Sequence, residues 1–175
     1  MLKAMKQTGM VLLILASIGV IGGAIWISMG ERAPDPAAFS FGEKSERMPV
    51  KVFFSNAALG SNEDCTKVFP ATRMVEKTQA VARAALSELL KGPTFDETRQ
   101  GYVTNINPGV VLQWLSVSEN GIAEVDMSSD IERGLGGSCR VAALRAQINE
   151  TMRQFPTVKD IIISVDGRIE DALQP

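Results

Sequence analysis

The stretch from residue 9 to residue 30, near the amino terminus, is rich in apolar residues and contains no charged residue. A helix rises about 1.5 Å per residue, so this stretch spans about 30 Å, the thickness of the hydrocarbon core of a bilayer. Lys3 and Lys6 precede it, and the charges directly after it cancel. We therefore predict a cytoplasmic tail over residues 1–8 and a single transmembrane helix over residues 9–30, with the remainder of the chain outside the cytoplasm.

A cleavable signal peptide is the alternative interpretation of this stretch. The apolar run is longer than the usual core of a signal peptide, and no A-x-A pattern follows it, so we prefer an uncleaved anchor. Residues 31–48, which contain two prolines, small residues and mixed charges, are expected to form a tether. Residues 49–175 then form one extracytoplasmic domain, which is long enough to bury a hydrophobic core.

Strands are expected in this domain wherever apolar residues alternate with polar ones. The expected strands are 50–55, then 110–117 with Val111, Gln113, Leu115 and Val117 on one face, a returning strand around Ile122 and Val125, and 158–165. Asn120-Gly121 is a hairpin turn in which both central residues accept positive φ. Residues 68–76 are ambiguous, with a short edge strand interrupted by Pro70 as one interpretation.

Helices are expected wherever apolar residues recur at steps of three and four. The first follows Thr78, which we expect to cap it, and ends at Gly92-Pro93. The second covers residues 138–154 and ends before Pro156, whereas residues 94–109 look irregular. This order of elements predicts an α+β fold, a mixed β-sheet with two helices packed on one face, preceded by one transmembrane helix.

Composition removes several kinds of active site. The 175 residues include no histidine and only two cysteines, which excludes a Ser-His-Asp triad, a Cys-His pair and a four-thiolate metal site. No S-x-x-K sequence occurs, so no serine has an evident activating base. The balance of 18 basic and 20 acidic residues argues against nucleic acid as a partner. The sequence therefore indicates no cofactor, no metal and no catalytic residue.

The two cysteines have two interpretations. Cys65 lies in a loop and Cys139 begins the second helix, and cysteines of one small exported domain usually pair. The alternative is a reactive thiol at a helix amino terminus, where the helix dipole lowers the thiol pKa. We prefer the disulfide, because no histidine is present to assist a thiolate and the exterior is oxidising.

Three further features are candidates for binding or chemistry. A glycine-rich loop at residues 134–137 leads into the second helix, where Arg140 could help to bind an anion, although a tight turn explains the same residues. Asp126 and Asp130 form an acidic pair of the kind that glycoside hydrolases use, or else cap and face solvent. Trp114 and Tyr102 could stack on a sugar ring, but we favour packing for both.

Several segments together resemble a GerMN domain, the module named from a spore germination and sporulation protein. They are Val50–Ser55, Ala84–Thr94, Ala123–Ser128, Gly136–Ser138, Gln147-Ile148 and a last segment that begins with Gln154–Val158 and ends with Val165–Gly167. The resemblance covers most of the domain and implies an exported α+β module without catalytic residues of its own. It differs from the founding protein in having one copy and an apolar anchor.

The resemblance and the anchor together lead to a functional hypothesis. We expect a membrane-anchored, non-enzymatic extracytoplasmic module that mediates protein–protein assembly in the cell envelope. A peptidoglycan- or glycan-binding module is the alternative, with Trp114 or Tyr102 as its stacking platform. A wall hydrolase that uses Asp126 and Asp130 is the third hypothesis.

Overall fold

The computed structural model describes residues 45–174. The predicted transmembrane segment at residues 9–30 and most of the predicted tether lie outside these residues. Between residues 45 and 174, no helix combines the length and the apolar character that crossing a bilayer requires.

Strands and helices of the described chain lie close to the positions that the hydrophobic pattern predicts. The strands are β1 (Arg47–Asn56), β2 (Phe69–Glu76), β3 (Tyr102–Val103), β4 (Leu112–Val117), β5 (Ile122–Met127) and β6 (Asp160–Val165). The α-helices are α2 (Val81–Leu90), α3 (Phe95–Arg99) and α4 (Ser138–Arg153). The mixed α+β composition is therefore confirmed.

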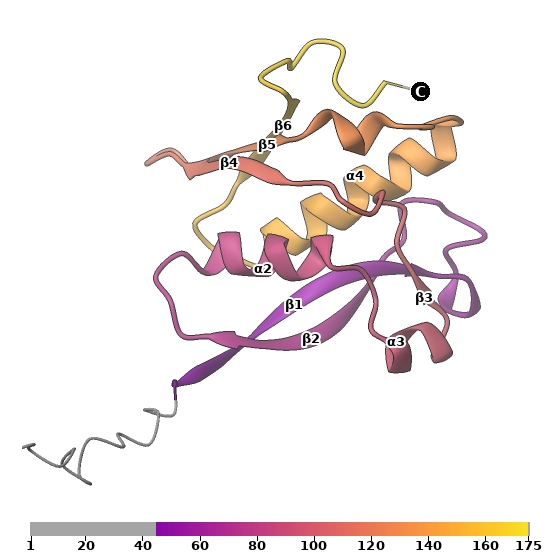
Figure 1. Cartoon of the computed structure of the whole chain (residues 1–175), viewed down its shortest axis with the longest axis horizontal. Coiled ribbons are helices and arrows are strands. Elements are labelled where there is room, and N and C mark those ends of the chain that lie inside the picture. Colours follow the sequence, from indigo (N-terminus) through magenta and orange to yellow (C-terminus); the bar gives the residue numbers. More distant parts are fainter. Residues whose placement is uncertain (1–44, 175) are drawn as a thin grey trace, which may run out of the picture. The chain divides into compact units, whose positions relative to one another are not determined.

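The prediction of one sheet with two helices on one face is wrong, because the described strands form two separate sheets. The first sheet has the order β2-β1-β3 and is antiparallel. The second has the order β4-β5-β6, in which β4 and β5 are antiparallel and β5 and β6 are parallel. Helix α4 makes the long crossover that parallel neighbours require. Helices α2 and α4 lie between the two sheets (Figure 1).

Both sheets and both long helices contribute to one hydrophobic core. Its fully buried large side chains include Phe54 of β1, Leu86 and Leu89 of α2, Met127 of β5, and Leu144 and Ile148 of α4. Burial of each such side chain stabilises the fold by about 1.5–3 kcal/mol. The shared core explains why each sheet can have as few as three strands.

Helix α4 also covers the edge of β1 with polar side chains that take the place of a neighbouring strand. The Phe53 N–H donates to Thr151 Oγ1 at 3.1 Å and the Lys51 N–H donates to Gln154 Oε1 at 2.9 Å. Gln154 Nε2 in turn donates to the Lys51 carbonyl at 2.7 Å. Backbone groups of β1 that would otherwise lack partners are thereby satisfied, and the strand edge is protected from pairing with another chain.

The segment at residues 94–109, expected to be irregular, contains α3 and β3. The Glu97 N–H donates to Thr94 Oγ1 at 3.3 Å, and the Thr94 N–H donates to Glu97 Oε2 at 2.7 Å. This reciprocal pair is a capping box, and its T-x-x-E pattern is visible in the sequence. Helix α3 has only 5 residues, which is too short to produce a hydrophobic period.

Pro70 and Thr78, which precede α2, have other roles than the strand break and the helix cap that the sequence predicts. Pro70 does not interrupt the strand, because it lies near the start of the edge strand β2, opposite Phe53, where a missing N–H is tolerated. Thr78 is not the cap of the helix, which begins after Ala80 without a side-chain cap. The Ala80 N–H instead donates to Thr78 Oγ1 at 3.1 Å, in the approach to the helix.

A bulge in β4 changes which of its side chains face the core. The register with β5 shifts between Leu112 and Trp114. Leu112 and Leu115 pack against the core, whereas Gln113 is exposed and Val111 is 56% exposed. The predicted common face of Val111, Gln113, Leu115 and Val117 is therefore wrong, because one extra residue reverses the alternation.

The predicted hairpin between β4 and β5 is present, but its turn is of another type. Gly121 has a φ angle of 89°, whereas the φ angle of Asn120 is not positive. The Gly121 N–H donates to the Ser118 carbonyl at 2.9 Å, so a type I turn precedes the glycine. A Cβ at Gly121 would lie 2.9 Å from the Thr157 carbonyl oxygen. Glycine is therefore required here both for its backbone angle and for space.

An ion pair joins α3 to β2. Arg73 Nε donates to Glu97 Oε1 at 2.9 Å, and its Nη2 donates to the Gly92 carbonyl at 3.0 Å. The side chains of Arg73 and Glu97 are only 12% and 14% exposed. Burial acts to raise the pKa of Glu97, but the hydrogen bonds and charge of Arg73 and the Thr94 N–H outweigh it, so that the pKa is lowered.

We expect Arg73→Ala to lower the free energy of unfolding by about 2–3 kcal/mol at neutral pH, because it leaves a largely buried carboxylate without its main donor. A lowered carboxyl pKa stabilises the fold above the unfolded-state value, and this stabilisation is lost as the pH falls through the folded-state value. The difference in the free energy of unfolding between Arg73→Ala and wild type should therefore be smaller at about pH 3 than at neutral pH. Urea unfolding at neutral pH and at about pH 3 measures this difference, and Arg47→Ala is the control because Arg47 is exposed. An equal loss of unfolding free energy at both pH values would show that Arg73 does not lower the pKa of Glu97.

Candidate interaction surface at strand β4

The outer face of the second sheet is a candidate interaction surface. Ala123, Val125 and Met127 of β5 point into the core, so the intervening residues of the sheet point away from it. The strand registers place Asp126 between Trp114 and Ser164, and Glu124 beside Ile162. A shallow pocket of about 300 Å³ lies among these side chains and the nearby Ile169. We call this surface the Trp114 face, and its residues are Trp114, Glu124, Asp126, Ile162, Ser164 and Ile169.

Trp114 is the most prominent side chain of this face. It is 59% exposed, as is Ile169, so the Trp114 ring is not packed in the core. The bulge in β4 puts Trp114 in register with Asp126, on the outer side of the sheet. An exposed tryptophan next to other apolar side chains is typical of binding surfaces, because its large ring gains much from losing contact with water.

Asp126 and Glu124 give the Trp114 face two carboxyl groups. Asp126 Oδ1 accepts hydrogen bonds from Ser164 Oγ at 2.6 Å and from the Gly167 N–H at 2.9 Å. It therefore ties β5 to β6 and to the turn that follows β6. No basic residue lines the pocket of this face, which is consequently acidic as well as apolar.

Asp126 and Asp130 have different neighbours in the described structure. Asp130 lies in the 3-10 helix Ser129–Glu132, where it pairs with Arg133. It does not line the pocket beside Asp126. Within residues 45–174, no group of three or more acidic or cysteine side chains is placed to hold a metal ion. The two aspartates thus have separate structural partners.

A third carboxyl group lies near this sheet, at the turn after β6. Hydrogen bonds from Ser129 and Gln113 lower the pKa of Asp166. Gln113 Nε2 donates to Asp166 Oδ1 at 2.8 Å, so the bulged residue of β4 fastens the turn. Asp166 and Gly167 both have positive φ, at 46° and 77°. A turn therefore follows β6 at these two residues.

Tyr102 and Arg140 have structural partners rather than free surfaces. Tyr102 is half-buried against the core, and its hydroxyl donates to the Pro70 carbonyl at 3.3 Å. Arg140 donates to the Gly134 carbonyl at 2.8 Å and to Asn107 Oδ1 at 2.7 Å. It therefore holds the glycine-rich loop against the Asn107 turn. Tyr102 is thus tied to the first sheet, and the guanidinium of Arg140 is already engaged.

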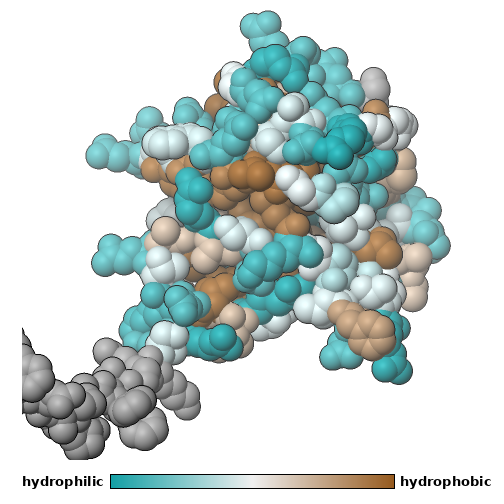
Figure 2. Space-filling view, viewed as in Figure 1, coloured by the Kyte–Doolittle hydropathy of each residue, from teal (hydrophilic) through white to brown (hydrophobic). Residues whose placement is uncertain are grey.

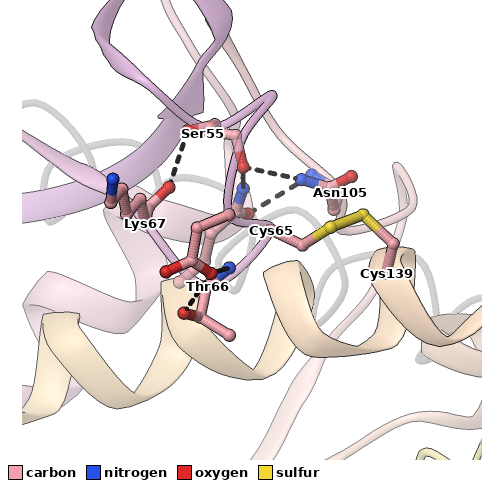
Figure 3. Close-up of a disulfide and its surroundings, with 9 residues drawn as sticks. Ser55, Cys65, Thr66, Lys67, Asn105 and Cys139 are labelled. Carbon is pink, nitrogen blue, oxygen red and sulfur yellow. Dashed lines mark hydrogen bonds between the residues drawn. A yellow bond between two sulfur atoms is a disulfide. The ribbon is translucent and has the colours of Figure 1, made fainter.

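Cys65 and Cys139 are joined by a disulfide (Figure 3). Their Cα atoms are 5.4 Å apart, although 74 positions separate them in the sequence. The bond ties the loop after β1 to the first turn of α4. Near it, Asn105 Nδ2 donates to Ser55 Oγ at 2.9 Å and links a third segment to the same region.

A second surface at β4 was missed by the sequence reasoning. It is a groove of about 370 Å³ between the start of α2 and strand β4, lined by Gln79–Arg83, Leu115–Val117, Phe155 and Thr157. We call it the α2–β4 groove. Figure 2 shows an apolar strip on this side of the molecule, between α2 and β4. The sequence shows only an apolar residue, Val117, at the end of the expected strand, and the structure shows that it is 39% exposed.

Comparisons with known proteins agree with the fold. A family model named Germane, described as sporulation and spore germination, matches residues 51–171. The chain is similar to the tandem GerMN domains of the sporulation protein GerM from Bacillus subtilis, with 10% identity and a TM-score of 0.55. That match covers 74% of this chain and 43% of the tandem-domain structure.

The first GerMN domain of the same Bacillus subtilis protein is similar at 13% identity and a TM-score of 0.53, over 72% of this chain and 88% of that one. A comparison with curated proteins found no match. The structural likenesses show the fold, and the family model covers more than half of the sequence. The predicted resemblance to a GerMN domain is thus confirmed, and the chain belongs to the Germane family of sporulation and spore germination.

Proposed function

We propose that this protein is a membrane-anchored, non-enzymatic module whose domain lies outside the cytoplasm and mediates protein–protein assembly in the cell envelope. The apolar stretch at residues 9–30, preceded by Lys3 and Lys6, supports the anchor and its orientation. Membership of a family described by sporulation and spore germination supports a role in such a process.

The observation that carries the binding role is the exposure of Trp114. Its ring lies on the outer face of the second sheet, with Ile169, Glu124 and Asp126 lining the same pocket. Protein interfaces typically have an aromatic anchor surrounded by polar groups that exclude water from it. The Trp114 face has both parts of this arrangement.

We expect Trp114→Ala to reduce recovery of a partner at least about tenfold, because truncation of an interface tryptophan commonly costs about 2 kcal/mol or more. The measurement is quantitative mass spectrometry of proteins cross-linked to the full chain before the membranes are solubilised. Phe95→Ala is the matched control, since Phe95 is 78% exposed but belongs to α3 rather than to the second sheet.

Two outcomes would contradict the proposal. One is equal recovery of every cross-linked protein by Trp114→Ala and by wild type. The other is protection of the domain from protease added to intact cells whose outer layers are permeable, because the proposal expects the protease to digest it. Protection of the domain until the cells are lysed would place it in the cytoplasm.

Glycan binding is the second candidate, and the same exposed ring favours it. A tryptophan face can stack on a sugar ring, and the carboxylates of Glu124 and Asp126 can accept hydrogen bonds from sugar hydroxyls. Sedimentation of the full chain with purified peptidoglycan distinguishes the two candidates. Retention that Trp114→Ala abolishes would favour the glycan, whereas no retention would exclude it.

A further inference from the structure

Strand β4 has one edge without a strand partner among residues 45–174, because it is terminal in the order β4-β5-β6. At the hairpin, the Ser118 N–H donates to the Ile122 carbonyl at 2.9 Å. Antiparallel ladders alternate between hydrogen-bonded and non-hydrogen-bonded pairs, so the next pair towards the strand, Val117–Ala123, is non-hydrogen-bonded. The backbone N–H and C=O groups of Leu115 and Val117 therefore point to the free edge.

This free edge lies in the α2–β4 groove. Leu115 and Val117 line the groove on one side, and Val81 and Ala82 of α2 line it on the other, with Phe155 beside them. The groove thus combines unpaired backbone donors and acceptors with apolar walls. An extended peptide that adds to a sheet edge needs this combination, because its backbone pairs with the strand while alternate side chains enter apolar pockets.

The charge of the groove indicates what kind of segment fits. Arg83 is half-buried on its wall, and within residues 45–174 it forms no ion pair of 4.0 Å or less. None of the residues that line the groove is acidic, and the first turn of α2 holds no acidic side chain that could neutralise Arg83. A carboxylate on the incoming segment would complement this charge.

We propose that the α2–β4 groove binds an extended segment of a partner protein, which pairs with the edge of β4 and places an Asp or Glu side chain against Arg83. The inference deepens the proposed function, since it assumes that the domain binds protein. It assigns a surface distinct from the Trp114 face: the groove is cationic, whereas the pocket of the Trp114 face contains two carboxyl groups and no basic residue.

Selection of random peptides displayed on phage tests the charge. The full chain is kept in mild detergent, and selections with wild type and with Arg83→Glu are compared. Wild type should enrich peptides with an acidic residue at one position, and Arg83→Glu should enrich a basic residue there. A wild-type-selected peptide should bind Arg83→Glu at least about tenfold more weakly, and an acidic-to-basic exchange in the peptide should restore binding.

Arg47→Glu is the control for the change in net charge, since Arg47 is exposed on β1 and does not line the groove. It should select the same peptides as wild type. Identical selections by wild type and Arg83→Glu, or no enriched sequence, would overturn the proposal. Self-association of the chain that Arg83→Glu abolishes would identify a second copy as the occupant and would also overturn it.

N-methylated versions of a selected peptide test the strand pairing without changing the protein. Methylation of alternate amides, those that face β4, should abolish binding, whereas methylation of the intervening amides should leave it within about twofold. Equal effects of both sets would refute strand addition. Failure of both peptide experiments would leave the proposed assembly role standing, because that role is tested separately by Trp114-dependent cross-linking.

Discussion

Replacing both cysteines with serine should lower the free energy of unfolding by about 4 kcal/mol, a large fraction of the stability of an ordinary domain. Cys65 and Cys139 are 74 positions apart, so the bond removes many conformations from the unfolded chain. Chain-entropy models assign a cross-link of this loop length about that stabilisation. The bond also joins the loop after β1 to the first turn of α4.

Denaturant unfolding of the Cys65→Ser, Cys139→Ser double variant provides the measurement. Reduction of the wild type should produce the same loss, and reductant should not change the double variant. A loss below about 1 kcal/mol in both experiments would contradict a stabilising role for the bond. Intact mass before and after reduction and alkylation determines whether the two thiols are paired in the purified protein.

Gln147→Leu should lower the free energy of unfolding by about 3 kcal/mol, because it leaves several buried polar groups without partners. Gln147 is fully buried on α4. Its Oε1 accepts hydrogen bonds from Thr104 Oγ1 at 3.1 Å and from the Asn105 N–H at 3.3 Å. Its Nε2 donates to Ser55 Oγ and to the Val103 carbonyl, both at 3.3 Å. One side chain thus links α4, β1 and β3.

The control for this substitution is Gln100→Leu, which makes the same chemical change at an exposed position. It should alter stability by no more than about 0.5 kcal/mol. Thermal and urea unfolding of both variants provide the comparison. A similar small loss in Gln147→Leu would show that the apolar side chain is accommodated and that the hydrogen bonds contribute little net stability.

The long helices and most strands could be predicted because their signals are local. The stripe from Val81 to Leu90 gives Leu86 and Leu89, which are fully buried, and the stripe in α4 gives Leu144 and Ile148. Helix α3 carried a signal of another kind, the Thr94–Glu97 capping box, which hydrophobic periodicity does not detect.

The candidate surfaces were harder to predict, because each depends on a departure from regular alternation or on the pairing of distant strands. Trp114 was singled out by its residue type, but a regular strand does not predict the bulge that places it in register with Asp126. Tyr102 was named for its aromatic ring and Arg140 for its place after the glycine-rich loop, and the structure gives both of them intramolecular partners. Arg83 gave no signal, because its importance comes from a groove formed with β4.

The family resemblance follows from the order and spacing of several short segments. Periodicity along the chain is sufficient for the kinds of most elements and their approximate ends, because these depend on neighbouring residues. It does not specify the division into two sheets, since a strand such as β1 has the same alternation whether its neighbour is β2 or β5. Which strands pair, which edge stays free and which side chains remain exposed depend on packing between distant segments around one shared core. The Trp114 face and the α2–β4 groove are products of that packing.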